Sequence, residues 1–312
     1  MKRSFTEVYN EVYAKNNDKL ESLKKDRMVK TIIFIFVIIF TIFLGFNLGK
    51  TNEGLFILLF FLVFIELIAF IIFARKSTNS LYNRMYKANV IAEIIRGVDS
   101  NLNYNPDYGI SETNYRKSKF NLYYDIFSSE DYICGKLENG ISVEMSEVRT
   151  QEWQESTDSD GNTTRSLVTT FSGFYGVLEL PTFLLASFII CKNSKLREFS
   201  ETRIELDSAE FEKRFDCFAM ELDKVKTMEL LTSDIIEKFI DFSDKALEKK
   251  GLQFKCEGNR IYFAIINSNT FEAPKIRRVM QFDELYKYYN MIDYPIQIAS
   301  EFVKRMNELN IN

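Results

Sequence analysis

The sequence contains no histidine, and it has only four cysteines among its 312 residues. The absence of histidine excludes catalytic triads and Cys–His pairs that use an imidazole, and it excludes zinc sites with histidine ligands. Four cysteines are too few for a disulfide scaffold in a chain of this length. The formal charge of −4 excludes a strongly basic protein that binds nucleic acid through bulk electrostatics.

Two long apolar runs lie near the N-terminus. Residues 31–49 carry no charged side chain, and residues 54–73 carry one, Glu66. About 20 helical residues cross a hydrocarbon core of roughly 30 Å. Because only residues 50–53 separate the runs, the sequence predicts a transmembrane helical hairpin over residues 31–73. Two buried helices of a soluble core are the alternative, but such helices normally keep a polar stripe.

Basic side chains flank both runs on the side away from the connecting turn. The residues nearest the runs form a collar that could meet lipid headgroups: Lys24, Lys25, Arg27, Lys30, Arg75 and Lys76. The turn itself has only Lys50, so the positive-inside rule predicts two spans with both termini in the cytoplasm. The collar is therefore either a lipid-recognition feature or the ordinary topology signal. In the reducing cytoplasm the four cysteines should be free thiols.

Helical patterns continue on both sides of the hairpin. Ser4 and Glu7 form a capping-box motif, and apolar residues follow at helical spacing, so residues 1–30 are predicted to be an amphipathic cytoplasmic helix. Residues 74–100 carry a second apolar stripe. The two segments could pair as a stalk, or each could lie separately on the soluble domain or the membrane surface.

Residues 101–312 are predicted to form a cytoplasmic α+β domain. Asn-Gly and Gly-Asn turns between alternating runs predict β-hairpins around residues 138–140 and 257–259. A four-stranded antiparallel sheet is expected over residues 132–137, 141–153, 167–180 and 183–191, with a polar loop at 154–166. Helices are predicted over residues 233–247, 282–292 and 296–309. Pro295 lies between the last two and should stop or kink the helix there.

Glu66 is the leading candidate for a functional side chain. A carboxylate in the middle of a span is costly, so it is functional or paired by default. Its level on the first span is near Val37, where no side chain is polar, and Thr41 lies one turn away. Glu66 is therefore expected to be protonated, or to meet a second copy or another protein. A tolerated, protonated glutamate with no role is the alternative.

Other candidate sites are weaker. Glu144, Glu147 and Glu152 share a predicted strand and could support acid–base chemistry, but a solvated strand face is the simpler explanation. Residues 158–162 resemble part of a calcium loop, yet the twelfth position is Leu167 instead of the required glutamate. The sequence has no phosphate-binding loop and no G-x-S-x-G motif. It therefore predicts no catalytic residue, no metal site and no cofactor.

Several blocks of residues resemble one known family. They include Gly109-Ile110-Ser111, Asp131-Tyr132-Ile133-Cys134-Gly135-Lys136, Thr170-Phe171-Ser172-Gly173-Phe174, Phe211-Glu212-Lys213-Arg214-Phe215 and Arg260-Ile261-Tyr262-Phe263-Ala264. The chain is similar to the uncharacterised bacterial membrane family called domain of unknown function 3137. The resemblance implies two N-terminal spans in the bacterial inner membrane and a cytoplasmic domain. It also makes a LemA-type membrane protein a candidate partner, and it transfers no active site.

The sequence thus favours a membrane-anchored scaffold or regulatory subunit of an inner-membrane assembly. Its partners would be membrane lipids and either another protein or a second copy, with no nucleic acid. A membrane-associated enzyme that uses carboxylates and lysine is one alternative. An accessory subunit of a transport complex that uses Glu66 is the other.

Overall fold

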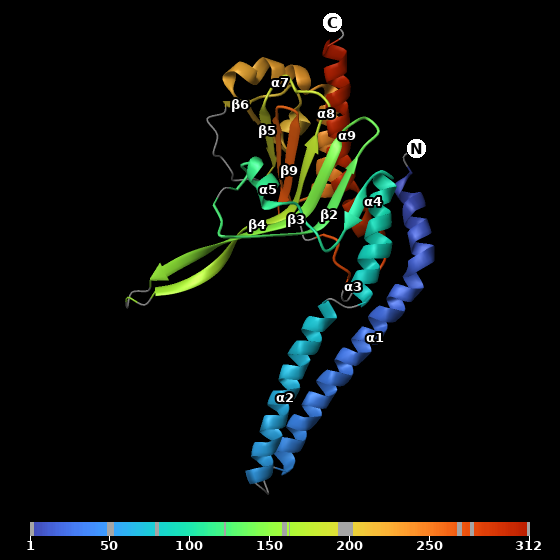
Figure 1. Ribbon diagram of the computed structural model, residues 1–312, viewed down its shortest axis with the longest axis vertical. Helices are drawn as coiled ribbons and strands as arrows, with labels where there is room; N and C mark the ends of the chain where they lie inside the picture. The colour runs from blue at the N-terminus through green and yellow to red at the C-terminus, as the bar shows by residue number, and fades with distance from the viewer. Residues whose placement is uncertain are drawn as a thin grey trace. The chain divides into compact units, whose positions relative to one another are not determined.

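The computed structural model describes residues 3–48, 53–78, 81–121, 123–157, 161, 163–192, 202–266, 270–274 and 278–310. The chain divides into two compact units, each described here by itself (Figure 1). We call the first the helical unit, Asn10–Ile91 with Glu272–Gln281. The second is the sheet unit, which comprises Met1–Tyr9, Ala92–Phe271 and Phe282–Asn312. The α+β class is confirmed.

Helix α1, Phe5–Leu48, is continuous through the amphipathic segment and the first apolar run. It begins at the predicted capping box. The Ser4 backbone N–H donates to Glu7 Oε2 over 2.9 Å, and the Glu7 N–H donates to Ser4 Oγ over 3.4 Å. These bonds satisfy two of the donors that a helix start leaves free. The helical unit continues with α2 (Glu53–Thr78), α3 (Leu81–Tyr86) and a π-turn (Lys87–Ile91).

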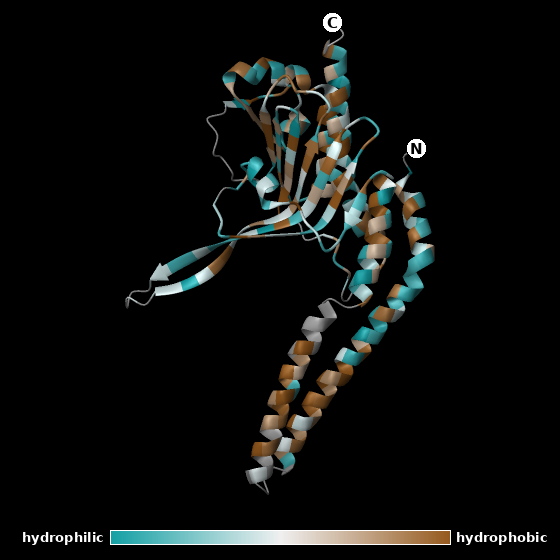
Figure 2. Cartoon of the chain, viewed as in Figure 1, coloured by the Kyte–Doolittle hydropathy of each residue, from teal (hydrophilic) through white to brown (hydrophobic). Residues whose placement is uncertain are grey.

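The apolar part of α1 is long enough and hydrophobic enough to cross a membrane, and its side chains are almost entirely uncovered. Phe36 and Phe46 are each 68% exposed, and in α2 Phe61 is 60% exposed. Figure 2 shows both helices brown along this stretch. Helix α2 adds a shorter described apolar stretch, Phe61–Phe70. An uncovered apolar surface of this extent marks a membrane or protein contact site.

The polar part of the helical unit is held by hydrogen bonds between distant segments. The Tyr82 hydroxyl donates to the Pro274 carbonyl over 2.7 Å, and the Val279 N–H donates to Glu21 Oε1 over 2.7 Å. The Asn16 amide donates to the Asn89 carbonyl over 3.4 Å. That last bond lies between the helical segments before and after the two apolar runs.

Nine described strands form one antiparallel sheet in the order β1-β2-β3-β4-β9-β8-β5-β7-β6. Their bounds are Asn103–Asn105 (β1), Ile126–Lys136 (β2), Ser142–Thr157 (β3), Thr163–Glu179 (β4), Phe188–Lys192 (β5), Thr202–Ile204 (β6), Asp216–Ala219 (β7), Gly251–Glu257 (β8) and Arg260–Ile266 (β9). Both predicted hairpins are confirmed, with Gly140 and Gly258 at positive φ in their turns. The expected neighbour relation of β4 and β5 is wrong, because β9 and β8 lie between them.

The two faces of the sheet carry separate apolar cores. On one face Tyr115 and Phe120 pack with Tyr175 of β4 and Tyr262 of β9. On the other face Phe254 of β8 meets helix α8, and Phe188 of β5 meets helix α9. The helices of the sheet unit are α4 (Ala92–Val98), α5 (Glu112–Lys117), α6 (Ala209–Glu212), α7 (Lys224–Leu230), α8 (Ser233–Phe242) and α9 (Phe282–Asn310). The packing of β4 against β9 requires a glycine at position 176, since a Cβ there would lie 2.3 Å from the Phe263 ring.

Strands β3 and β4 extend past the sheet as a two-stranded ribbon (Figure 1). The polar loop predicted at 154–166 is therefore mostly strand, paired as far as Thr157 and Thr163. Most side chains of the ribbon are polar and exposed, as suits a solvated ribbon, and the Arg165 guanidinium lies 4.8 Å from the centre of the Trp153 ring. Of the calcium-like segment, residues 158–160 and 162 lie outside the described residues.

Helix α9 runs through Pro295 without ending, so the two helices predicted over residues 282–292 and 296–309 are one helix. Proline removes one hydrogen bond from a helix, at a cost of about 3 kcal/mol or more. Residues on both sides of it are fully buried, among them Met291, Ile292, Ile298 and Ala299. The apolar contacts of both halves therefore hold the helix together.

We expect Phe239→Ala to destabilise the protein by about 3–5 kcal/mol, because it empties a site in the core. Phe239 is fully buried, and its ring centre lies 4.9 Å from that of Phe254. Urea unfolding of the full chain in mild detergent measures the loss. Phe183→Ala is the matched control, since Phe183 is 71% exposed. Equal losses in the two variants would contradict this account of the core.

Candidate functional site

A β-bulge in β2 creates the most unusual polar site of the sheet unit. The pairing of β2 with β3 is regular up to Glu130 and resumes at Ile133. Asp131 lies in the bulge with a φ of +58°, and its carboxylate accepts a hydrogen bond from the Tyr104 hydroxyl. Bulges redirect side chains and are common beside functional sites.

Glu147 lies across from Glu130 on strand β3 and is buried. Its Oε1 accepts hydrogen bonds from both the backbone N–H and the hydroxyl of Thr270. Burial raises the pKa of Glu147 to about 8, although the Thr270 bonds oppose this; the carboxylates of Asp131 and Glu130 raise it further. Glu147 can therefore bind or release a proton near neutral pH.

These three carboxylates offer oxygen atoms within 4.8 Å of one another. Glu130 and Glu147 also border a hollow of about 690 Å³, whose other lining residues include Arg149, Ser128, Ser129, Thr169 and Ser172. Oxygen ligands of this kind suit hard cations such as Mg²⁺ or Ca²⁺. Glu147 and Asp131 already have hydrogen-bond donors of their own, so the cluster by itself defines a protonatable site and does not define a metal centre.

The three glutamates grouped by the sequence analysis are separated by the structure. Glu144 accepts a hydrogen bond from the Asn114 amide on one face of the sheet, over 3.0 Å. Glu147 bonds Thr270 in a buried position, so a solvated strand face does not explain it. Glu152 is half-buried at the start of the β3–β4 ribbon. Asp131 and Thr270 had no sequence signal, because their roles depend on a bulge and on contacts between distant segments.

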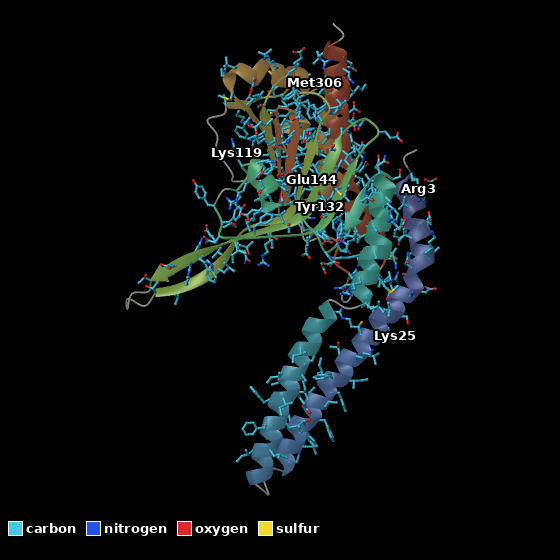
Figure 3. All side chains as sticks on the ribbon, in the orientation of Figure 1. Arg3, Lys25, Lys119, Tyr132, Glu144 and Met306 are labelled. Atoms are coloured by element: carbon cyan, nitrogen blue, oxygen red, sulfur yellow. The ribbon has the colours of Figure 1, made fainter. Side chains whose placement is uncertain are left out.

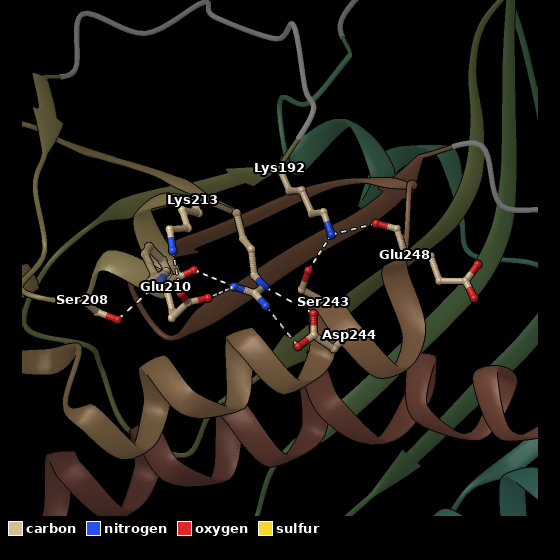
Figure 4. A network of polar contacts seen from close by, with 9 residues as sticks. Lys192, Ser208, Glu210, Lys213, Ser243, Asp244 and Glu248 are labelled. Atoms are coloured by element: carbon tan, nitrogen blue, oxygen red, sulfur yellow. Dashed lines mark hydrogen bonds and ion pairs between the residues drawn. The ribbon is translucent and has the colours of Figure 1, made fainter.

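A second buried polar network lies at the end of α8 (Figure 4). The Lys192 ammonium group is 2.5 Å from Ser243 Oγ and 2.8 Å from the Glu248 carbonyl oxygen. Burial lowers the pKa of Lys192. A serine beside such a lysine can be a nucleophile, but Ser243 is only 2% exposed. Lys192 instead ties the end of β5 to the π-turn Ser243–Leu247, where its charge complements the helix carbonyls.

Glu66 has a partner within its own unit. The Thr41 hydroxyl donates to the Val37 carbonyl over 3.1 Å and lies 3.0 Å from Glu66 Oε1, so the threonine one turn from the predicted level meets the carboxyl group. The long glutamate side chain spans that turn. The other oxygen, Oε2, is enclosed and has no hydrogen-bond partner. Glu66 therefore points between α1 and α2.

The collar residues differ in their surroundings. Lys24 is buried and lies 3.5 Å from Glu21 Oε2, so it is not available to a lipid headgroup in this conformation. Lys25, labelled in Figure 3, and Lys30 are exposed, and Arg27 is half-buried. The side chains of Arg75 and Lys76 lie outside the described part of the chain. None of the four cysteines, Cys134, Cys191, Cys217 and Cys256, is part of a disulfide, as predicted.

Residues 169–304 match the family described as Protein of unknown function (DUF3137). This match confirms the resemblance to the family for that segment. No curated protein matches the sequence. A similar solved structure is the mycobacterial trehalose monomycolate transport factor A, TtfA, at 11% identity, with 67% of this chain and 93% of that chain covered. The TM-score between the two structures is 0.33.

We expect Glu147 to make stability depend on pH. Its folded pKa of about 8 lies above the ordinary value of 4.5. Between these values the folded protein keeps a proton that the unfolded chain loses, so stability falls as pH rises, by up to about 1.4 kcal/mol per pH unit. Unfolding titrations from pH 5 to 9 measure this slope. Glu147→Gln should flatten it.

Glu152→Gln is the control for this experiment, because it removes a half-buried carboxyl group from the same strand, away from Thr270 and the bulge. It should keep the wild-type dependence on pH. If Glu147→Gln and the wild type show the same slope, Glu147 does not carry a raised pKa.

Proposed function

We propose that the protein is a membrane-anchored binding subunit, a scaffold or regulatory component of a bacterial inner-membrane assembly. The observation that supports this most is the uncovered apolar surface of α1 and α2. Glu66, which lies within the second apolar run, points its carboxyl group inward at Thr41. Apolar side chains outside and a polar pair inside are the arrangement that a hydrocarbon solvent favours. In this proposal α1 and α2 are the two spans, and both termini are cytoplasmic.

The charge distribution supports the same orientation. Exposed Lys25 and Lys30 follow the amphipathic part of α1, where anionic headgroups of the cytoplasmic leaflet would attract them. The chain from residue 74 onward is acidic, with a net charge of −6. Like-charge repulsion would keep that part off the headgroups and off nucleic acid.

The proposed partner is another membrane protein, with a LemA-type protein as the first candidate, or a second copy of the chain. A role for Glu66 in lining a transport path receives less support, because its free oxygen is enclosed by its own unit. The sheet unit, with its ribbon and its polar hollows, would provide the binding surface.

Topology can be tested by cysteine labelling in a Cys134→Ser background, since the remaining native thiols are buried. We expect Asn52→Cys, in the connecting turn, to react with a membrane-impermeant maleimide in intact spheroplasts. Glu152→Cys on the ribbon should react only after lysis. Labelling of Glu152→Cys in intact spheroplasts, or protection of Asn52→Cys, would contradict two spans with cytoplasmic termini.

The binding role predicts a stoichiometric partner. The tagged full chain is to be purified from native membranes in mild detergent, and its mass and composition measured by light scattering and mass spectrometry. A LemA-type protein or a second copy should be retained, whereas the same tag on an unrelated two-span hairpin should retain neither. Recovery of a monomer alone, across several mild detergents, would rule out the scaffold.

A further inference from the structure

The sheet unit has a second hollow, which we call the tyrosine pocket, with a volume of about 570 Å³. Strand β1, the segment after it, β2 and β3 provide its walls. Its lining includes Tyr108, Tyr132, Cys134 and Glu144, whereas the Tyr104 side chain leaves the opposite face of β1, where it bonds Asp131. Tyr132 and Glu144, both labelled in Figure 3, come from the neighbouring strands β2 and β3.

Backbone contacts hold the walls of the tyrosine pocket in place. The Tyr132 N–H donates to the Tyr108 carbonyl over 3.0 Å, and the Ile110 N–H donates to Ser146 Oγ over 2.9 Å. Gly109 lies so close to β2 that a Cβ would be 2.4 Å from the Ser129 carbonyl carbon. The segment that carries Tyr108 is thus fixed against the sheet, and the pocket is present before any ligand arrives.

The pocket has one charged group, and that group is negative. None of the described residues that line it is basic, and Glu144 is its only acidic side chain. Burial raises the pKa of Tyr132 to about 12, with Glu144 as the next cause. Burial and then Glu144 also raise the pKa of the Cys134 thiol. Both neighbours of Glu144 therefore stay neutral at physiological pH and add no second negative charge.

We infer that the tyrosine pocket binds an organic ammonium group. Tyrosine rings present negative faces that attract cations, and aromatic residues around a carboxylate are suited to alkylated ammonium ions, whose methyl groups also need apolar contact. Glu144 supplies the opposite charge, and the Asn114 amide holds its Oε2 in place over 3.0 Å. This ligand site goes beyond the proposed binding of a protein partner and does not depend on the membrane topology.

The ammonium group could belong to a free amine, to a lipid headgroup or to a methylated lysine side chain, because these share the same recognition chemistry. Titration calorimetry on the full chain in maltoside detergent compares choline with its neutral isostere, 3,3-dimethylbutan-1-ol. We expect saturable binding of choline and binding of the isostere weaker by about tenfold or more, as expected for a desolvated cation–π contact and one carboxylate. Dihexanoyl phosphatidylcholine and N-acetyl trimethyllysine amide then distinguish the sources, since the probe that matches the natural ligand should bind tighter than choline.

Variants locate the site. Glu144→Gln keeps the shape and an acceptor for Asn114, and it should weaken choline by about tenfold. Tyr132→Leu should weaken it as well, whereas Tyr132→Phe retains the ring and should bind nearly as well as the wild type. Glu152→Gln, on the same strand, is the control and should have no effect. Thermal melting checks that each variant is folded.

Two results would overturn the inference. One is the absence of saturable binding for every ammonium probe to the folded wild-type chain. The other is equal binding of choline and the neutral isostere, which would mean that the pocket selects shape and not charge. Neither result bears on whether the chain spans the membrane or retains a protein partner, so the proposed function is tested separately.

Discussion

The ladder between β4 and β9 is the interaction on which the sheet unit depends. It pairs Gly173–Glu179 with Arg260–Ile266 in an antiparallel register, and it is the link between the meander β1–β4 and the strands β5–β9. Without it the chain would hold two smaller sheets, each with an unpaired edge. The ladder also places successive side chains on opposite faces. Phe174 meets Phe271 on one face, and Tyr175 meets Tyr115 on the other.

The same alternation separates the two polar sites. Glu144 and Glu147 lie three positions apart on β3, so their side chains leave opposite faces of the strand. One ends beside Asn114 and the tyrosines, and the other ends beside Thr270 and the bulge. Two carboxyl groups with similar intrinsic chemistry thereby acquire different environments. Burial and neighbouring carboxylates raise the pKa of Glu147, whereas Glu144 lies among tyrosine rings and an amide donor.

Local signals in the sequence predict local structure well. The capping box at Ser4, the turns at Gly140 and Gly258 and the apolar run of α1 all depend on residues close together in the chain, and each is found in the structure. The errors concern long-range packing. Nothing near β5 indicates that β8 will pair with it, and nothing near Pro295 indicates that buried residues on both sides will keep α9 continuous.

The polar sites fail to appear in the sequence for the same reason. Asp131 acquires its place from a bulge, Glu147 from a contact with residue 270, and Lys192 from a turn more than 50 residues away. These positions look like ordinary surface charges when the sequence is taken alone. Charged and polar groups become informative only when the fold removes them from water, since their free energy then depends on a few specific neighbours.

Glu66 shows how one such neighbour changes an interpretation. In the proposed hairpin, one oxygen of Glu66 meets the Thr41 hydroxyl, and the other is enclosed without a partner. An unsatisfied buried oxygen costs on the order of 1–3 kcal/mol of stability. A leucine at position 66 would avoid this cost, so a glutamate there calls for a role that offsets it. Two helices with apolar side chains can slide or rotate against each other with little change in energy, and a single polar pair removes that freedom. Because the carboxyl group of Glu66 points between α1 and α2, its contact with Thr41 is of the kind that can fix the register of the two helices.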